Sequence, residues 1–207
     1  MTGLTVERLS GSAIEPFLAD LAALRIEVFR EFPYLYEGTL DYESRYLRSY
    51  ASSERSVVVI AREGSNVVGA STAMPATEHD EEVATAFQEG GIDPNDVYYF
   101  GESVLRASYR GRGIGHAFFD HRESRARELG FKLASFCAVV RAPDHPSKPA
   151  DYAPHDAFWN KRGFSKRPDL CAKFAWRDLG DTHETRKPIV FWTSSSSGVT
   201  SATETLP

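Results

Sequence analysis

Hydrophobic positions recur along the chain with two spacings, one typical of strands and one typical of helices. Strands are predicted where β-branched and aromatic residues run together or alternate with polar ones: residues 4–9, 56–62, 67–74, 97–105 and 131–140, with shorter runs at about 170–176 and 188–193. The stretch Glu-Gly-Ser-Asn at 63–66 predicts a hairpin turn between the second and third strands.

Four segments show the three- and four-residue spacing of amphipathic helices. The first begins near Ser12, and the second is capped by Asp41. The third opens after an Arg/Gly-rich turn and stops at Gly130, and the fourth is short, at 155–164. Strands and helices thus alternate, which predicts a mixed α/β fold.

Two segments interrupt this pattern. Residues 77–96 are acidic and partly helical, and we expect a surface insertion there. Residues 194–207 are rich in serine and have the composition of a disordered tail. We therefore expect a single domain over residues 1–193 that includes the insertion.

Composition and charge exclude several classes of protein. The 207 residues include 24 Lys or Arg and 29 Asp or Glu, a formal charge of −5, which argues against a nucleic-acid partner. No apolar run approaches a membrane span, and no signal pattern opens the chain, so we expect a cytoplasmic protein without a membrane partner. Cys137 and Cys171 are interpreted as reduced packing residues. The six histidines lack metal-ligand spacing, so no metal is expected.

The segment with candidate chemistry is Tyr-Arg-Gly-Arg-Gly-Ile-Gly-His at 109–116, between a predicted strand and a predicted helix. Alternate glycines let the backbone approach an anion, and the first amides of the helix point toward it. Arg106, Arg110 and Arg112 lie within seven residues of an otherwise acidic chain. The pattern predicts a pyrophosphate cradle, with a ligand-free Gly-rich turn as the alternative.

Two other phosphate motifs fit less well. A P-loop requires Lys and then Ser or Thr after the last glycine, whereas His116 and Ala117 follow Gly115. A dinucleotide fingerprint would need glycine at position 116, and this strand-helix unit lies in mid-chain.

The spacing Arg110-x-x-Gly113-x-Gly115 after a strand resembles the acyl-CoA signature of the GNAT N-acetyltransferase superfamily. Residues 157–164, Ala-Phe-Trp-Asn-Lys-Arg-Gly-Phe, are similar to that family's short fourth helix and its Gly-Phe ending. The resemblance implies a central mixed sheet of about seven strands, flanked by helices, with the fourth and fifth strands splayed around the pantetheine. It also implies direct transfer of an acetyl group from acetyl-CoA, as co-substrate, to a primary amine in a ternary complex.

Carried over position by position, the resemblance assigns the cofactor-binding residues. The end of the fourth strand would meet the pantetheine, the turn would hold the pyrophosphate, and the fourth helix would supply one wall. These residues are Ser103, Val104, Leu105, Arg110, Gly111, Arg112, Gly113, Ile114, Gly115, His116 and Trp159. The Leu105 N–H is the candidate oxyanion donor, since negative charge develops on the thioester oxygen.

Glu102 is the candidate general base, because an attacking amine must lose a proton and a carboxylate in mid-strand is rarely placed without a partner or a purpose. Strand alternation predicts that Glu102 shares a face with Tyr98, Phe100 and Val104. The alternative is a carboxylate paired with a nearby arginine or exposed at the strand edge.

The family's usual acid, a tyrosine four residues before the glycine of Gly-Phe, is replaced by Trp159, whose indole cannot serve as a proton source. The thiolate either leaves without help or is protonated from water, or Tyr152 or His155 supplies the proton. Trp159 itself is either a wall against the pantetheine or a core residue. The substitution motivates an alternative function, a CoA-binding or sensing module without efficient turnover.

The resemblance places the acceptor near the first two helices, where acidic and aromatic residues are interleaved. These are Glu27, Glu31, Phe32, Tyr34, Tyr36, Glu37, Asp41, Tyr42 and Glu43. Such a surface suits a cationic or amphipathic amine, either a small molecule or a peptide, although a solvated helix face is equally compatible. We expect a monomer or a homodimer.

Overall fold

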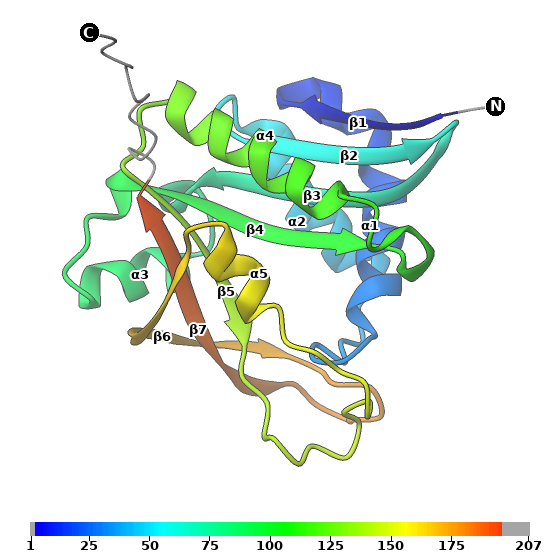
Figure 1. The fold of residues 1–207 in the computed structure, drawn as a ribbon, viewed down its shortest axis with the longest axis vertical. Helices are drawn as coiled ribbons and strands as arrows, with labels where there is room; N and C mark the ends of the chain where they lie inside the picture. Colours follow the sequence, from blue (N-terminus) through cyan, green and yellow to red (C-terminus); the bar gives the residue numbers. More distant parts are fainter. Residues whose placement is uncertain (1–2, 196–207) are drawn as a thin grey trace, which may run out of the picture.

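The β-branched runs of the chain pair into one mixed sheet in the computed structural model, which describes residues 3–195 (Figure 1). Within those residues the strand order is β1-β2-β3-β4-β5-β7-β6. The strands are β1 (Leu4–Leu9), β2 (Val57–Glu63), β3 (Asn66–Pro75), β4 (Val97–Leu105), β5 (Leu133–Val139), β6 (Ser165–Trp176) and β7 (Thr185–Ser195). The α/β class and the seven-stranded sheet expected from the resemblance are confirmed.

Five α-helices in the described residues cover the two faces of the sheet. They are α1 (Leu18–Phe29), α2 (Leu40–Ser52), α3 (Glu81–Glu89), α4 (Ile114–Glu128) and α5 (Asp156–Lys161). Helices α4 and α5 lie on one face, and α1 and α2 lie on the other (Figure 1). Short 3-10 turns occupy Gly11–Phe17, Ala76–Glu78, Pro94–Asp96 and Ala107–Tyr109.

Several predicted boundaries need correction. The segment after β1 is a 3-10 turn through Phe17 before α1 begins, because Pro16 cannot donate a backbone hydrogen bond within an α-helix. The cap of α2 is Thr39, whose hydroxyl accepts from the Tyr42 amide at 3.4 Å, and not Asp41. Ser194 and Ser195 end β7, so the predicted tail begins two residues too early; residues 196–207 lie outside the described part.

The insertion at 77–96 is more than a surface segment. Its helix α3 buries Val83 and Phe87 completely, and the Phe87 ring contacts the Phe191 ring of β7 at 5.2 Å between centroids. The acidic composition hid this apolar face, which forms a separate small core with Tyr99 and Leu170.

The fourth and fifth strands separate along their length. Their parallel pairing covers only Val97–Tyr99 of β4, opposite residues 133–135 of β5. Beyond that point β5 continues to pair with β7, while β4 stays with β3 (Figure 1). One edge of β4 therefore lacks a strand partner over its second half, which is the splay implied by the resemblance.

A β-bulge lies in β4 where the gap begins. Ala73 of β3 pairs with Phe100 and Ser71 pairs with Ser103, so Gly101 and Glu102 stand opposite Thr72 alone. The extra residue reverses the alternation of side chains after it. Tyr98 and Phe100 pack on the α4 side, whereas Val104 packs on the α1/α2 side. The prediction that Glu102 shares a face with Tyr98 and Phe100 is therefore wrong.

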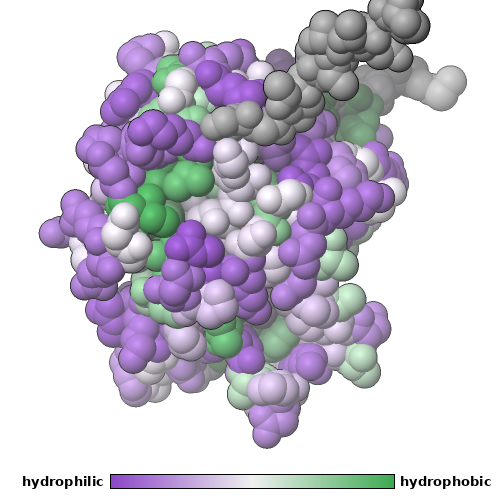
Figure 2. Space-filling model, turned by 60° about the vertical axis from the view of Figure 1, so that its left-hand side comes forward, coloured by the Kyte–Doolittle hydropathy of each residue, from purple (hydrophilic) through white to green (hydrophobic). Residues whose placement is uncertain are grey.

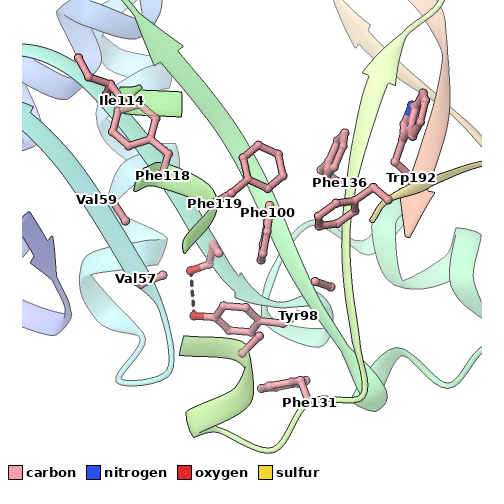
Figure 3. Packing of buried hydrophobic residues seen from close by; sticks show 14 of the residues in the cluster. Val57, Val59, Tyr98, Phe100, Ile114, Phe118, Phe119, Phe131, Phe136 and Trp192 are labelled. Carbon is pink, nitrogen blue, oxygen red and sulfur yellow. Dashed lines mark hydrogen bonds between the residues drawn. The ribbon is translucent and has the colours of Figure 1, made fainter. Parts of the chain in front are cut away.

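The larger core lies between the sheet and α4. The Phe119 ring of α4 lies 5.9 Å from the Phe100 ring of β4, and Ile114 and Phe118 of α4 extend the same cluster (Figure 3). The Phe136 and Trp192 rings stack at 6.3 Å on the neighbouring strands. On the outer face drawn in Figure 2, hydrophilic side chains predominate and hydrophobic ones form smaller areas between them. The aromatic residues thus fix α4, and with it the turn that precedes it.

Gly101 is required by the close approach of hydroxyl groups to the bulge. A Cβ at this position would lie 2.2 Å from the Tyr50 hydroxyl and 2.7 Å from the Thr72 hydroxyl. We expect Gly101→Ala to lower the free energy of unfolding by about 1–3 kcal/mol through overpacking. Denaturant unfolding measures the change. Gly3→Ala is the control, because a Cβ there meets no heavy atom within 4 Å. Equal stability of the two variants would contradict the steric argument.

Candidate functional site

The turn before α4 has the geometry of an anion cradle. Gly111 and Gly113 adopt left-handed φ values of 75° and 81°, and Gly113 caps the helix without a side-chain hydrogen bond. A Cβ at either glycine would meet no heavy atom within 4 Å, so the space in front of the turn is open. Of the expected cradle amides, that of His116 donates to the Gly113 carbonyl at 3.0 Å. The amides of Ile114 and Gly115 belong to the first helical turn, where intrahelical acceptors are lacking.

The three arginines near this turn have structural partners. Arg106 makes a bidentate ion pair with Glu27 of α1, and Arg110 pairs with Glu31 at 2.8 Å. Arg112 lies over the Tyr109 ring, with its guanidinium carbon 5.0 Å from the centroid. Clustering in sequence therefore does not make all three free for phosphate, because Arg106 and Arg110 join the end of β4 to α1.

The free edge of β4 presents backbone groups to the gap. The Arg106 amide donates to the Val68 carbonyl at 3.0 Å, and the Leu105–Gly69 pair is therefore of the non-hydrogen-bonded kind. By the same alternation, the N–H groups of Leu105 and Ser103 point away from β3. The amide of Val104 points toward β3, and its side chain is buried under α1 and α2. Leu105 and Ser103 thus fit the assigned backbone role, whereas Val104 does not offer its backbone.

Glu102 points to the α1/α2 side, where it pairs with a buried arginine. Oε1 of Glu102 lies 2.5 Å from Nη1 of Arg25, and the Nε of Arg25 donates to Glu43, which has no exposed surface. Burial disfavours the charge of Arg25, but the carboxylates of Glu102 and Glu43 outweigh it and hold the pKa of Arg25 above its ordinary value. Of the alternatives for Glu102, the arginine pair is the one observed.

A group of hydroxyls surrounds the other oxygen of Glu102. Tyr46 of α2 donates to Oε2 at 2.9 Å, and its hydroxyl also lies 2.9 Å from that of Tyr50 and 3.2 Å from Nε2 of His79. Burial and the nearby charge of Glu102 raise the pKa of Tyr46. Burial lowers the pKa of His79. Tyr46 and His79 are therefore both uncharged at pH 7.

The bulge is also held from the α4 side. Nη1 of the buried Arg122 donates to the Glu102 carbonyl at 3.2 Å, and its guanidinium lies over the Phe100 ring at 4.4 Å. Burial lowers the pKa of Arg122 to about 9, so the group is charged at pH 7. Arg25 and Arg122 thus fix Glu102 from opposite faces of the sheet.

A cavity of about 630 Å³ opens on the α1/α2 side, between the separating strands. Gly101 and Glu102 of β4 and Cys137 of β5 form its floor. Aromatic residues contribute to its walls, among them Phe29, Tyr34, Tyr36, Tyr42, Phe174 and Trp176. Asp80, Glu82 and Glu184 add carboxylates, and Glu37 adds one that is paired with Arg30. The cations of the lining are Arg177 and Arg25, of which Arg25 is already neutralised by its two partners.

An ion-pair cluster fixes the loop between α1 and α2 over this cavity. Arg141, just after β5, makes a bidentate pair with Asp178 and donates to the carbonyls of Pro33 and Tyr34. The buried ammonium of Lys187 lies 3.2 Å from the same Asp178 carboxylate. These contacts hold the aromatic residues of the loop in position.

Trp159, His155 and Tyr152 lie in α5 and in the segment that precedes it. Trp159 is half-buried and packs against the edge of the core, with its ring centroid 5.0 Å from those of Phe136 and Trp192. A contact with pantetheine remains a prediction. The pKa of His155 is lowered by burial and by Arg110, which leaves the imidazole neutral at pH 7 and unsuited to donate a proton. Tyr152 packs on Phe32 and keeps its proton, because burial raises its pKa.

Sequence reasoning missed the residues around Glu102. Arg25 lies on the same buried face of α1 as Leu21 and Leu24. A charged residue on an apolar helix face is unusual, and this could have indicated a buried ion pair. Tyr46 and His79 gave no comparable signal, because tyrosine is common on half-buried helices and His79 lies in the acidic insertion.

Neither a metal-binding cluster nor a membrane-spanning helix occurs in residues 3–195. No group of three or more His, Cys, Asp or Glu side chains there is arranged to hold a metal ion. None of the helices in this range is long and apolar enough to cross a membrane.

Comparison with known proteins agrees with this geometry. The sequence profile of the acetyltransferase (GNAT) family matches residues 21–164. Among solved structures, the ribosomal-protein-alanine N-acetyltransferase of Brucella melitensis is 15% identical, covers 92% of this chain and 99% of its own, and has a TM-score of 0.61. The structure of yncA from Salmonella typhimurium with its cofactor acetyl-CoA is 10% identical, covers 95% and 96% of the respective chains, and has a TM-score of 0.58. No curated protein matches the sequence.

Substitution of Arg25 tests how much its buried ion pairs contribute to stability. We expect Arg25→Met to lower the free energy of unfolding by about 3–5 kcal/mol, because it leaves two buried carboxylates without a cation. Protonation of the stranded carboxylates becomes favourable in the folded variant, so its deficit relative to the unmodified protein should shrink as the pH falls. Denaturant unfolding between pH 5 and pH 8 measures this.

Arg30→Met is the matched control, since Arg30 follows the same helix and its pair with Glu37 is exposed. We expect it to cost less than about 1 kcal/mol. A similar loss in both variants would contradict the special role of the buried pair.

Proposed function

The chain belongs to the acetyltransferase (GNAT) family, and from this premise we propose that it transfers the acetyl group of acetyl-CoA to a primary amine by direct attack in a ternary complex. The observation that carries the proposal is that three features of the structure lie next to one another along β4. The open turn at Gly111 and Gly113, the unpaired edge of β4 at Ser103 and Leu105, and the cavity beside Glu102 follow one another along β4. A pyrophosphate, a thioester and an amine would meet them in that order.

The turn before α4 and the free edge of β4 offer hydrogen-bond donors that suit acetyl-CoA. The open turn gives backbone amides and the dipole of α4 for a pyrophosphate, and the free N–H groups of Ser103 and Leu105 are donors for the pantetheine chain. The Leu105 N–H is the proposed donor to the thioester oxygen. Acetyl-CoA would supply the acetyl group as a thioester, and the remaining chemistry is that of positioning the amine and removing its proton.

We place the acceptor in the cavity on the other side of the bulge. Its aromatic walls and its carboxylates at Asp80, Glu82 and Glu184 favour a small cationic or amphipathic amine. A peptide amine is the alternative, which a panel of acceptors would distinguish.

In this proposal Glu102 positions another group and does not itself act as the free general base. Its two oxygens are engaged by Arg25 and Tyr46. It therefore acts on the proton through Tyr46, by orienting that hydroxyl at the floor of the cavity.

A thiol-release assay with acetyl-CoA tests the activity. We expect CoA to be released when small diamines, aromatic amines or peptides are supplied, with the preferred class being the small cationic or aromatic amines. Tight CoA binding with no transfer to any of them would instead favour the CoA-binding module suggested by Trp159.

The cradle is tested separately by binding. We expect Gly113→Glu to weaken acetyl-CoA binding at least ~100-fold, because it brings a side chain and a negative charge to the proposed pyrophosphate site. Calorimetry measures the Kd. Gly180→Glu is the matched control, since Gly180 has the same left-handed backbone, with φ of 86° and open surroundings, but lies between β6 and β7. Equal Kd values for the two folded variants would disprove the phosphate site.

A further inference from the structure

The Tyr46 hydroxyl is the point where the polar groups of the cavity converge. It lies within 2.9 Å of Glu102 and of Tyr50, and 3.2 Å from Nε2 of His79. Tyr46 and His79 both line the cavity, and Tyr46 is only half-buried. Tyr46 can therefore meet a substrate nitrogen on one side and His79 on the other.

Glu102 is poorly suited to take the proton itself. Arg25 contacts one of its oxygens at 2.5 Å, and Tyr46 donates to the other at 2.9 Å. A proton added to Glu102 would compete with the Arg25 ion pair and leave the buried guanidinium with less compensation.

His79 has the properties of a proton acceptor. Its side chain is 5% exposed, and Oδ2 of Asp80 lies 3.6 Å from Nδ1. Nδ1 makes no hydrogen bond within the described residues, and the nearby Asp80 charge favours the tautomer with hydrogen on Nδ1. The Nε2 lone pair then lies 3.2 Å from the Tyr46 hydroxyl, whose hydrogen can be directed at Glu102 or at His79. The Tyr99 ring, 4.7 Å away between centroids, fixes the plane of the imidazole.

The charges around His79 agree with a neutral imidazole in the resting protein. Burial lowers its pKa and Arg25 lowers it further, whereas Asp80, Glu102 and Glu82 raise it. The neighbouring hydroxyls of Tyr46, Tyr50 and Tyr99 are uncharged at pH 7, because burial raises their pKa values. Once protonated, the imidazolium would be stabilised by Asp80.

We propose that His79 accepts the proton of the attacking amine through the Tyr46 hydroxyl. This rests on the proposed acetyl transfer and assigns a proton route that ends in the 77–96 insertion. Tyr46 is the group that would touch the substrate, and His79 acts through it. Glu102 and Arg25 hold the hydroxyl in place.

The protons balance along this route. An alkylammonium enters with three protons on nitrogen; as the C–N bond forms and the C–S bond breaks, the amide keeps one. One passes to the Tyr46 oxygen as the hydroxyl hydrogen of Tyr46 turns from Oε2 of Glu102 toward Nε2 of His79 and is transferred there, from which it is lost to water. The third also leaves the nitrogen for water, and the CoA thiolate takes one proton from water or from a separate donor, so that one proton is released overall.

The test is the pH dependence of kcat for His79→Gln. We expect kcat above pH 7 to fall about 100-fold, the lower range for a lost proton acceptor. We divide the kcat of the unmodified protein by that of the variant at each pH, because the ionisation of the amine affects both values equally and drops out of this ratio. This ratio should decrease as the pH falls through the pKa of His79, below 6.5, because a protonated imidazole no longer accepts. Asp80→Asn should move that decrease to lower pH.

The controls separate the route from a structural role. His183→Gln changes another histidine that lines the same cavity, and it should leave the ratio flat. Tyr46→Phe should reduce kcat, and adding His79→Gln to it should cause no further loss, since the two groups act in series. His79→Asn serves if His79→Gln does not fold. A wild-type pH profile in a folded His79 variant, or independent losses in the double variant, would overturn the proposal.

Histidine NMR gives a test that needs no acceptor. In the full chain, His79 should be neutral at pH 7 with its hydrogen on Nδ1. A protonated ring or hydrogen on Nε2 would overturn the route even if the protein transfers acetyl groups. If the unmodified protein transfers to no amine while the NMR result is as expected, it is the proposed function that fails.

Discussion

The β-bulge at Gly101 and Glu102 is the constraint on which the rest of the site depends. Two residues of β4 stand opposite Thr72 alone, and the change of alternation turns Glu102 away from the aromatic core under α4. Two buried guanidinium groups hold it, Arg25 on the carboxylate and Arg122 on the carbonyl. Hydroxyls fill the space where a side chain at position 101 would lie. A buried carboxylate is tolerated there because one of its oxygens accepts a hydrogen bond from Tyr46 and the other lies in an ion pair with Arg25.

The separation of β4 from β5 follows at the same place. Parallel pairing ends at Tyr99, and the free edge of β4 then faces the gap. One face of the sheet leads to the open turn before α4, and the other to the aromatic cavity. The bulge therefore lies where the proposed thioester and amine sites meet. The insertion belongs to this arrangement as well, since α3 is anchored by Phe87 and brings His79 and Asp80 to the cavity.

Much of the fold could be predicted from local pattern. The strands at 4–9 and 97–105 and the helix after the Gly-rich turn depend on short-range spacing, and the structure has them at those places. The turn at Gly111 and Gly113 could also be predicted, because glycine adopts positive φ without the steric penalty of a Cβ. Its part in binding a pyrophosphate stays a prediction. The partners of Arg106 and Arg110 were not visible, because Glu27 and Glu31 are 79 residues away in the chain.

The sequence by itself determined the α/β class, the order of the elements and the family signature, since these depend on periodicity and on neighbouring residues. Only the tertiary structure decided which face Glu102 occupies and which groups surround it. One extra residue in a strand reverses the alternation, and no local pattern marks where pairing will slip. The contacts of Glu102 come from α1, α2, α4 and β3, which lie far apart in the sequence and meet only in the folded protein.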